Sequence, residues 1–211
     1  MASKGNCYLC GAELGKAAMK NHILKLHSGE ISGQECRLLK IEGAYDKDYW
    51  LYVDIPVDKT LNALDKFLRK IWLECCGHMS KFQGAGKSNK AGRFSAGDQF
   101  LHLYDMGDTT ETLITVIGTT WRKPQREAIR LLARNVPSQF RCAKCGASAD
   151  FICVECGWDT ENPFYCEDCA KTHEHEDMLL PVTNSPRMGV CGYCGELDTF
   201  AFAPTKGKEK T

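Results

Sequence analysis

The residues best suited to chemistry in this chain are its cysteines, and most of them come in pairs. Ten of the 13 cysteines form five C-x-x-C pairs, in which two residues separate the two thiols. Such a pair can close a tight turn around one metal ion, and thiolates combined with imidazoles are the usual ligands of structural zinc. Residues 1–6 lack the apolar core of a secretory signal, so we expect a cytoplasmic protein with reduced thiols. The sequence therefore predicts a zinc-binding protein.

The N-terminal pair is followed by two histidines at zinc-finger spacing. Eleven residues separate the pair from the first histidine, and the second comes five positions later. Residues 17–26 are compatible with a helix, on which these histidines would lie about one and a half turns apart. Two thiolates and two imidazoles complete a tetrahedron around zinc. We predict a Cys-Cys-His-His finger over residues 1–30, with the ligands Cys7, Cys10, His22 and His27.

A second group of ligands lies between residues 140 and 200. Three cysteine pairs and two histidines offer eight ligands, enough for two zinc ions. They are Cys142, Cys145, Cys153, Cys156, Cys166, Cys169, His173 and His175. Because the pairs alternate along the chain, we expect a cross-brace in which the first and third pairs hold one ion and the second pair holds the other with the histidines. A competing assignment replaces His173 and His175 by Cys191 and Cys194.

The fifth pair, Cys191 and Cys194, lies among glycines that allow the turn of a zinc knuckle but has no obvious partner pair. The run 75–78, Cys-Cys-Gly-His, could supply one. An additional site made of Cys76, His78, Cys191 and Cys194 would tie the C-terminus to the central segment. The ligand count thus predicts about three zinc ions, and about four if this additional site forms.

The segment between these groups must form the body of the protein. Residues 49–55 are rich in aromatic and β-branched side chains, which is typical of a strand. A helix is expected next, since apolar residues recur there at spacings of three and four. These residues are Leu61, Leu64, Leu68, Ile71 and Trp72. Further strands are expected at 79–82, 99–104 and 110–117, and a loop at 84–97, whereas residues 125–134 fit either period.

These patterns predict an α+β protein with a central mixed sheet-plus-helix domain and small zinc-stabilised modules at both ends. We expect the central domain at residues 36–135, the multi-zinc module at 140–200 and a flexible tail at 204–211.

Charge restricts the choice of partner. The 27 basic residues are balanced by 27 acidic ones, which argues against a uniformly basic surface for nucleic acid. Local basic groups remain candidates for nucleic-acid contact, and three of the arginines, spaced by four, share a face in either a helix or a strand. The candidates are Lys20, Lys87, Lys90, Arg93, Arg126, Arg130 and Arg134. No apolar run approaches the ~20 residues of a membrane-spanning helix, so no membrane partner is expected.

Two parts of the chain resemble known families. The order and spacing of the ligands from Cys142 to His175 resemble the B-box zinc module, although the nine residues between Cys156 and Cys166 are more than that pattern usually has. This resemblance implies a role in protein contacts.

The central segment, residues 36–135, resembles the Ri-plasmid ORF-three-like domain family. The likeness lies in short motifs at matching order and spacing. They are Tyr49-Trp50-Leu51, Ile55-Pro56, Thr60-Leu61-x-x-Leu64-Asp65, the run 72–78 and the run 103–108. The resemblance implies an α+β fold but no catalytic residues, since the family offers none that are established.

We therefore expect a non-enzymatic adaptor that binds a protein partner or a nucleoprotein assembly, with no small-molecule substrate. The alternative is a nucleic-acid-binding regulator, with DNA or RNA as its partner and a link to mobile elements. A third class, thiol catalysis by Cys75 or Cys76 with His78 as base, has weak support, because catalytic Cys and His usually meet through the fold rather than in sequence.

Overall fold

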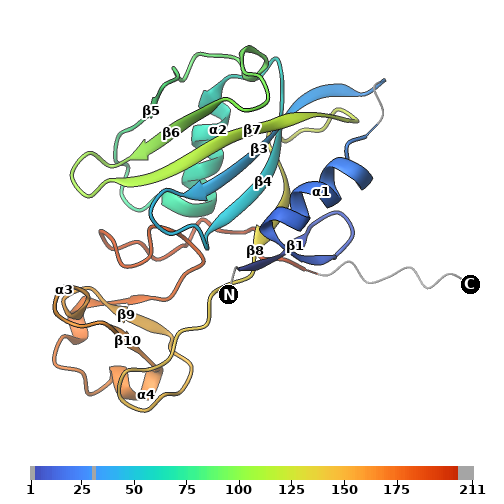
Figure 1. Ribbon diagram of the computed structural model, residues 1–211. Coiled ribbons are helices and arrows are strands. Elements are labelled where there is room, and N and C mark those ends of the chain that lie inside the picture. The colour runs from blue at the N-terminus through green and yellow to red at the C-terminus, as the bar shows by residue number, and fades with distance from the viewer. Residues whose placement is uncertain (1–2, 30–31, 204–211) are drawn as a thin grey trace, which may run out of the picture.

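The computed structural model describes residues 3–29 and 32–203. Its main element is an antiparallel sheet of eight strands in the order β2-β1-β8-β4-β3-β7-β6-β5, and a small separate sheet has the order β10-β9-β11 (Figure 1). The fold is α+β, as the sequence predicts. Within the described ranges, no helix has both the length and the apolar character needed to cross a membrane.

The elements have the following bounds. The large sheet contains β1 (Lys4–Cys7), β2 (Glu13–Gly15), β3 (Gln34–Gly43), β4 (Trp50–Pro56), β5 (Ser80–Gln83), β6 (Gln99–Tyr104), β7 (Thr110–Arg122) and β8 (Arg130–Asn135). The small sheet contains β9 (Phe151–Cys153), β10 (Phe164–Tyr165) and β11 (Leu179–Pro181). The helices are α1 (Lys16–Leu26), α2 (Leu61–Leu68), α3 (Cys156–Asp159) and α4 (Glu167–Ala170), and a π-helical turn, Arg69–Leu73, continues α2.

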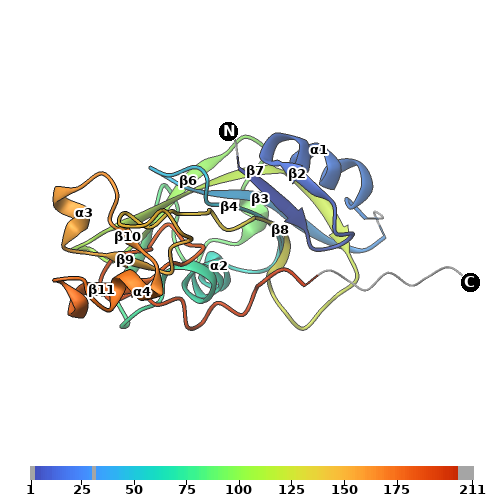
Figure 2. The ribbon, with the colours of Figure 1, turned by 90° about the horizontal axis from the view of Figure 1, so that it is seen from below.

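The side chains of strand β4 are buried on both faces of the large sheet. Alternate residues of a strand point to opposite faces. Leu51 and Val53 pack with α2 in one apolar cluster, whereas Trp50 and Tyr52 pack with Met19 of α1 in another. Figure 2 shows the two helices on opposite sides of the sheet. A strand with two apolar faces therefore requires a cover on each side, and the N-terminal helix supplies one of them.

The N-terminal finger is joined to the sheet itself. Strand β1 pairs antiparallel with β8, so that Gly5 lies opposite Asn135. A side chain at Gly5 would collide with the Arg134 carbonyl oxygen and the Trp50 indole, which explains the glycine in this strand. The finger and the central domain, which the sequence separates, therefore share one sheet.

Local elements follow the hydrophobic pattern closely, with three differences. Strand β3, which the sequence analysis leaves unassigned, pairs with both β4 and β7 at the centre of the sheet. Strand β7 continues five residues beyond the predicted end at 117, because β3 gives it a partner as far as Arg122. The ambiguous segment 125–134 contains a strand, β8, held between β1 and β4.

Candidate metal centres

The finger cluster consists of Cys7, Cys10, His22 and His27, which the structure brings together. Cys7 ends β1, and the turn to Cys10 is closed by two backbone hydrogen bonds, from Gly11 N to the Cys7 carbonyl (2.8 Å) and from Cys7 N to the Ala12 carbonyl (2.8 Å). The histidines come from α1 and its C-cap, with 3.1 Å between their Nε2 atoms. Burial and the neighbouring imidazole lower the pKa of His27, which favours the neutral form that binds metal.

The C-terminal module, residues 140–181, holds two further clusters in the alternating arrangement expected from the sequence. The tetracysteine cluster consists of Cys142, Cys145, Cys166 and Cys169, and the mixed cluster of Cys153, Cys156, His173 and His175. Short elements position the ligands, because β9 ends at the first ligand of the mixed cluster and α3 begins at the second, while α4 carries the last ligand of the tetracysteine cluster.

In each cluster of the module, the surroundings of one ligand favour its metal-binding form, whereas the pKa values of Cys145, Cys153 and Cys169 are raised by burial and the neighbouring thiols. Burial opposes ionisation of the Cys142 thiol, but hydrogen bonds from the backbone N–H groups of Cys166, Cys145 and Lys144 lower its pKa to about 6. Burial and the adjacent His175 lower the pKa of His173. A thiolate and a neutral imidazole are the ligand forms that zinc requires.

A fourth group, the linking cluster, joins segments that are far apart in sequence. It consists of Cys75, Cys76, His78 and Cys191. The first three follow α2 and its π-helical turn, where the Glu74 carboxylate accepts hydrogen bonds from Gly77 N (2.6 Å) and Tyr104 OH (2.9 Å) and so fixes the turn. The last belongs to the segment after the module, which passes between the sheet and the module (Figure 1).

The linking cluster differs from the predicted set in one ligand. The sequence predicts Cys194 there with Cys76, His78 and Cys191, but the structure has Cys75 instead. The left-handed backbone at Cys191 (φ 49°) and Gly192 (φ 67°) turns the chain, and Cys194 Sγ donates to the Gly192 carbonyl at 3.3 Å. Sequence spacing could not reveal this, because C-x-x-C spacing is only a common arrangement of ligands and not a required one.

The distances between ligand atoms are close to those around a tetrahedral zinc ion in the two clusters of the module. Metal–sulfur bonds of about 2.3 Å and metal–nitrogen bonds of about 2.0 Å separate two sulfurs by about 3.8 Å and a sulfur and a nitrogen by about 3.5 Å. The observed separations are 3.6 Å for Cys145 and Cys166, 3.8 Å for Cys76 and Cys191, and 3.4 Å for Cys156 Sγ and His173 Nε2. Sulfur–nitrogen distances in the other clusters are shorter, such as 3.2 Å for Cys10 Sγ and His22 Nε2 and 2.9 Å for Cys76 Sγ and His78 Nε2. In each cluster the four ligand atoms lie within 4.8 Å of one another. Each cluster could therefore hold a metal ion such as zinc.

A buried arginine holds the segment that carries Cys191 against the sheet. Arg187 is fully buried and donates to Asp105 Oδ2 (2.8 Å) and Thr110 Oγ1 (2.9 Å), with its guanidinium 4.8 Å from the centre of the Tyr104 ring. Burial of Cys75 favours its neutral thiol, but the Arg187 guanidinium outweighs that effect and lowers the pKa of this ligand. No local sequence signal predicts this anchor, because its partners lie about 80 residues away.

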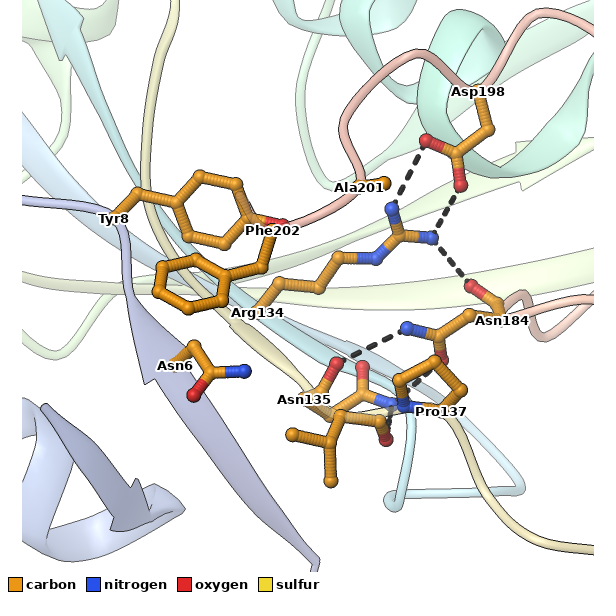
Figure 3. Close-up of a pocket in the computed structure, with 10 residues that line it drawn as sticks. Asn6, Tyr8, Arg134, Asn135, Pro137, Asn184, Asp198, Ala201 and Phe202 are labelled. Carbon is orange, nitrogen blue, oxygen red and sulfur yellow. Dashed lines mark hydrogen bonds and ion pairs between the residues drawn. The ribbon is translucent and has the colours of Figure 1, made fainter. Parts of the chain in front are cut away.

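Another buried arginine lines a cavity of about 310 Å³ between β1, β8 and the C-terminal segment. Arg134 points toward Asp198 and Asn184 there and donates to Asp198 Oδ1 (3.0 Å) and Oδ2 (2.6 Å) and to the Asn184 carbonyl (2.7 Å) (Figure 3). Its charge is therefore neutralised inside the protein, and only 4% of the residue is exposed. A nucleic acid on the surface could not reach it.

Some of the other candidates for nucleic-acid contact form ion pairs within the protein, and the rest do not. Arg130 is paired with Asp54 (2.5 Å) and Lys87 with Asp65 (3.0 Å), so their charges are also compensated. The remaining ones have no ion pair among the described residues, and they are Lys20, Lys90, Arg93 and Arg126. Three arginines do not form a basic stripe, since Arg126 lies in the loop before β8. Nucleic-acid contact stays a prediction for the unpaired residues.

A buried polar network, which the sequence analysis does not anticipate, joins α2 to β5 and β6. Asp65 accepts hydrogen bonds from His102 Nε2 (2.7 Å), Ser80 Oγ (2.6 Å) and Lys87 Nζ (3.0 Å). Burial raises the pKa of Asp65, but these donors, His102 first, outweigh it and hold the pKa well below its usual range. The network fixes the helix on the sheet beside the linking cluster.

Comparisons with known proteins add little to this geometry. No protein-family model matches the chain, and no curated protein does. A solved structure, that of a protein of unknown function (MM3350) from Methanosarcina mazei Go1, matches 49% of this chain and 70% of its own at 18% identity and a TM-score of 0.42. The likeness is distant and transfers no function. Membership of the Ri-plasmid ORF-three-like family stays a prediction.

Proposed function

We propose that this chain is a zinc-binding, non-enzymatic adaptor, whose metal modules around an α+β domain present surfaces to a protein partner. The observation that supports this most strongly is the composition of the four clusters. Each contains four cysteine or histidine ligands, which fill the coordination of zinc and leave no position for water or substrate. Closed sites of this kind stabilise structure, whereas catalytic zinc sites keep one position open.

The ligand sets also account for the residues that could otherwise carry out thiol chemistry. Cys76 Sγ lies 2.9 Å from His78 Nε2, a distance suited to a catalytic pair. However, His78 Nε2 is also 3.2 Å from Cys191 Sγ, and Cys75 completes the set. Metal binding explains the whole group, whereas a thiol nucleophile with its base would explain only two of the four residues.

The charge of the C-terminal module favours a protein partner over a nucleic acid. Between residues 142 and 178 the sequence contains nine acidic residues and two lysines. Zinc in the tetracysteine cluster would leave that site negatively charged as well, because four thiolates outweigh one divalent ion. A surface of this sign repels phosphate. The link to mobile elements remains part of the alternative, a nucleic-acid-binding regulator.

Metal counting tests the zinc part of the proposal. The full chain, purified without added metal or chelator, is expected to contain about four zinc ions by elemental mass spectrometry, one for each cluster. Substitution of one mixed-cluster ligand, Cys153→Ala, should remove about one ion and leave the other three. A protein that contains no zinc, or that loses none on this substitution, contradicts the proposal.

Affinity purification tests the adaptor part. The tagged full chain is expected to retain a specific protein partner after nuclease treatment and to release it when a chelator removes the metal. The Cys36→Ala variant is a suitable control, because Cys36 is a buried cysteine that belongs to none of the four clusters. Release of every partner by nuclease alone would instead support the nucleic-acid alternative.

A further inference from the structure

A groove of about 410 Å³ lies where the large sheet, the C-terminal module and the segment after the module meet. Three separate parts of the chain line it. They are the β6–β7 turn (Gly107, Asp108, Thr109), the start of the mixed cluster (Val154, Trp158) and the segment 189–191. The volume falls in the range of pockets that bind small ligands, about 300–1,000 Å³.

Each wall of this groove is held in place by one of the features described above. Trp158 belongs to α3, whose first residue, Cys156, is a ligand of the mixed cluster. Cys191 is a ligand of the linking cluster. The Asp108 carbonyl accepts a hydrogen bond from the buried Arg187 at 3.1 Å, which fixes the turn that forms the third wall. The groove is therefore preformed if the metal sites are filled.

Trp158 is the most unusual residue of the groove. It is 83% exposed, although a tryptophan normally buries most of its large apolar surface. It has no aromatic neighbour or cation over its ring among the described residues. An exposed indole beside a groove is typical of a contact surface, and its ring face attracts cations more strongly than that of any other side chain.

The exposed carboxylates near Trp158 favour a positively charged partner. Asp108 is exposed in the same groove, and its carboxylate forms no ion pair within the described part of the chain. Glu155, the N-cap of α3, and Asp159, the residue after Trp158, are likewise exposed and form no ion pair among the described residues. An aromatic face together with free carboxylates is complementary to a positively charged side chain and repels phosphates and acidic peptides.

We propose that this groove binds an arginine or lysine side chain of a basic segment in a partner protein, with the cation over the Trp158 ring and paired with the Asp108 carboxylate. The inference rests on the proposed function, because filled metal sites are needed to hold two of the walls. It deepens that function by naming the chemistry of the partner.

Fluorescence polarisation with labelled hexapeptides tests the proposal on the full zinc-loaded chain. The probes alternate glycine with arginine, lysine, leucine or glutamate, and a 20-nucleotide single-stranded DNA completes the set. The two cationic peptides are expected to bind and the others are not. Trp158→Ala should weaken binding of the arginine peptide about tenfold, whereas Trp158→Phe should retain part of the affinity because a phenyl ring also attracts cations. Asp108→Asn should weaken it about threefold.

Two control variants separate the groove from general surface effects. Tyr45→Ala removes an aromatic ring that is 85% exposed in the β3–β4 turn and does not line the groove, and it should leave binding unchanged. Asp168→Asn removes one exposed charge from α4 of the same module, so its effect should be smaller than that of Asp108→Asn.

Metal content is measured on every sample, so that the two proposals can fail separately. If zinc is present and the cationic peptides do not bind, or bind equally well to Trp158→Ala, the groove proposal is wrong while the zinc-binding adaptor stands. Preference for the leucine peptide, the glutamate peptide or the DNA also overturns it. If the purified chain contains no zinc, the proposed function fails first.

Discussion

The large sheet and the C-terminal module are stabilised in different ways. Two apolar clusters fill the sides of the sheet, with Leu64 and Trp72 among their fully buried members. The module has one small cluster of five buried residues, and three of them are the metal ligands Cys142, Cys153 and Cys156. Small domains bury too little apolar surface to be stable alone and often use metal ions instead. The comparison teaches that a metal ion such as zinc would substitute for a core in one region and would only add to a core in the other.

The finger is intermediate between these two cases. It has its own four-ligand cluster, yet Met19 and Ile23 of its helix are fully buried against Trp50 and Tyr52 of the sheet. Its strand β1 also pairs with β8. The finger should therefore depend on metal less than the module does, because part of its stability comes from the sheet.

Removal of metal should produce the largest difference in stability between the module and the large sheet. A high-affinity chelator is expected to unfold the module, since structural zinc contributes about 10–16 kcal/mol to small zinc domains. The large sheet should stay folded, and the finger should lose protection only in part. Hydrogen exchange followed by mass spectrometry would resolve the three regions. If all regions unfold together, or if the module keeps its protection, the comparison is wrong.

Loss of the buried arginine should weaken the junction between the regions. Arg187→Met removes the arginine partner of Asp105 and leaves this carboxylate only the Gly107 N–H and His78 beside it, so the substitution should lower the free energy of unfolding. Segment 184–195 should then exchange faster, and zinc should be lost from the linking cluster first. Arg126→Met, in an exposed loop, is the matched control and should change the free energy of unfolding by less than about 0.5 kcal/mol. Equal effects of the two substitutions would show that Arg187 anchors nothing.

A cavity in the apolar core should destabilise the large sheet and leave the module folded, the opposite of what metal removal should do. Leu64 of α2 is fully buried, and Leu64→Ala should lower the free energy of unfolding of the sheet by about 2–5 kcal/mol. The tetracysteine and mixed clusters should keep their two zinc ions, because neither depends on α2 for a ligand. Denaturant unfolding, read beside metal content, measures both effects. Loss of zinc from the module in this variant would mean that the regions are not independent.

As the pH falls, the module should unfold first and the large sheet should unfold at lower pH. Protons compete with zinc for thiolates and imidazoles, so the module should unfold first as the pH falls, and added zinc should restore it. In the sheet, burial lowers the pKa of His102, and the donors around Asp65 lower that of its carboxyl. Both groups then bind more protons in the unfolded chain, so the free energy of unfolding of the sheet should fall below about pH 6.5 and further below about pH 4.

Nuclear magnetic resonance at successive pH values would follow both transitions in one sample. Added zinc should shift the transition of the module but not that of the sheet. A sheet that unfolds before the module, or whose transition moves with zinc, would contradict this order.

The sequence predicted the short-range features of this protein better than the long-range ones. Three of the clusters use ligands that lie within about 35 residues of one another, and their spacings indicate them directly. The strand at 99–104 was placed correctly, because alternation and turn residues are local signals. By contrast, the pairing of β1 with β8, the anchor at Arg187 and the network around Asp65 join residues from distant parts of the chain. No local pattern encodes them, since they depend on how the sheet brings these residues together.

In the linking cluster, sequence spacing predicts one ligand that differs from the one in the structure. The test of this ligand has the smallest expected effect, a change of about one zinc ion. Cys75→Ser should reduce the zinc content from about four ions to about three, whereas Cys194→Ser should leave about four, since Cys194 Sγ is directed to the Gly192 carbonyl and not to the cluster. The two variants remove the same kind of atom from neighbouring parts of one surface, so they control for each other. If Cys194→Ser loses an ion and Cys75→Ser does not, the C-x-x-C spacing predicted the ligands better than the fold does.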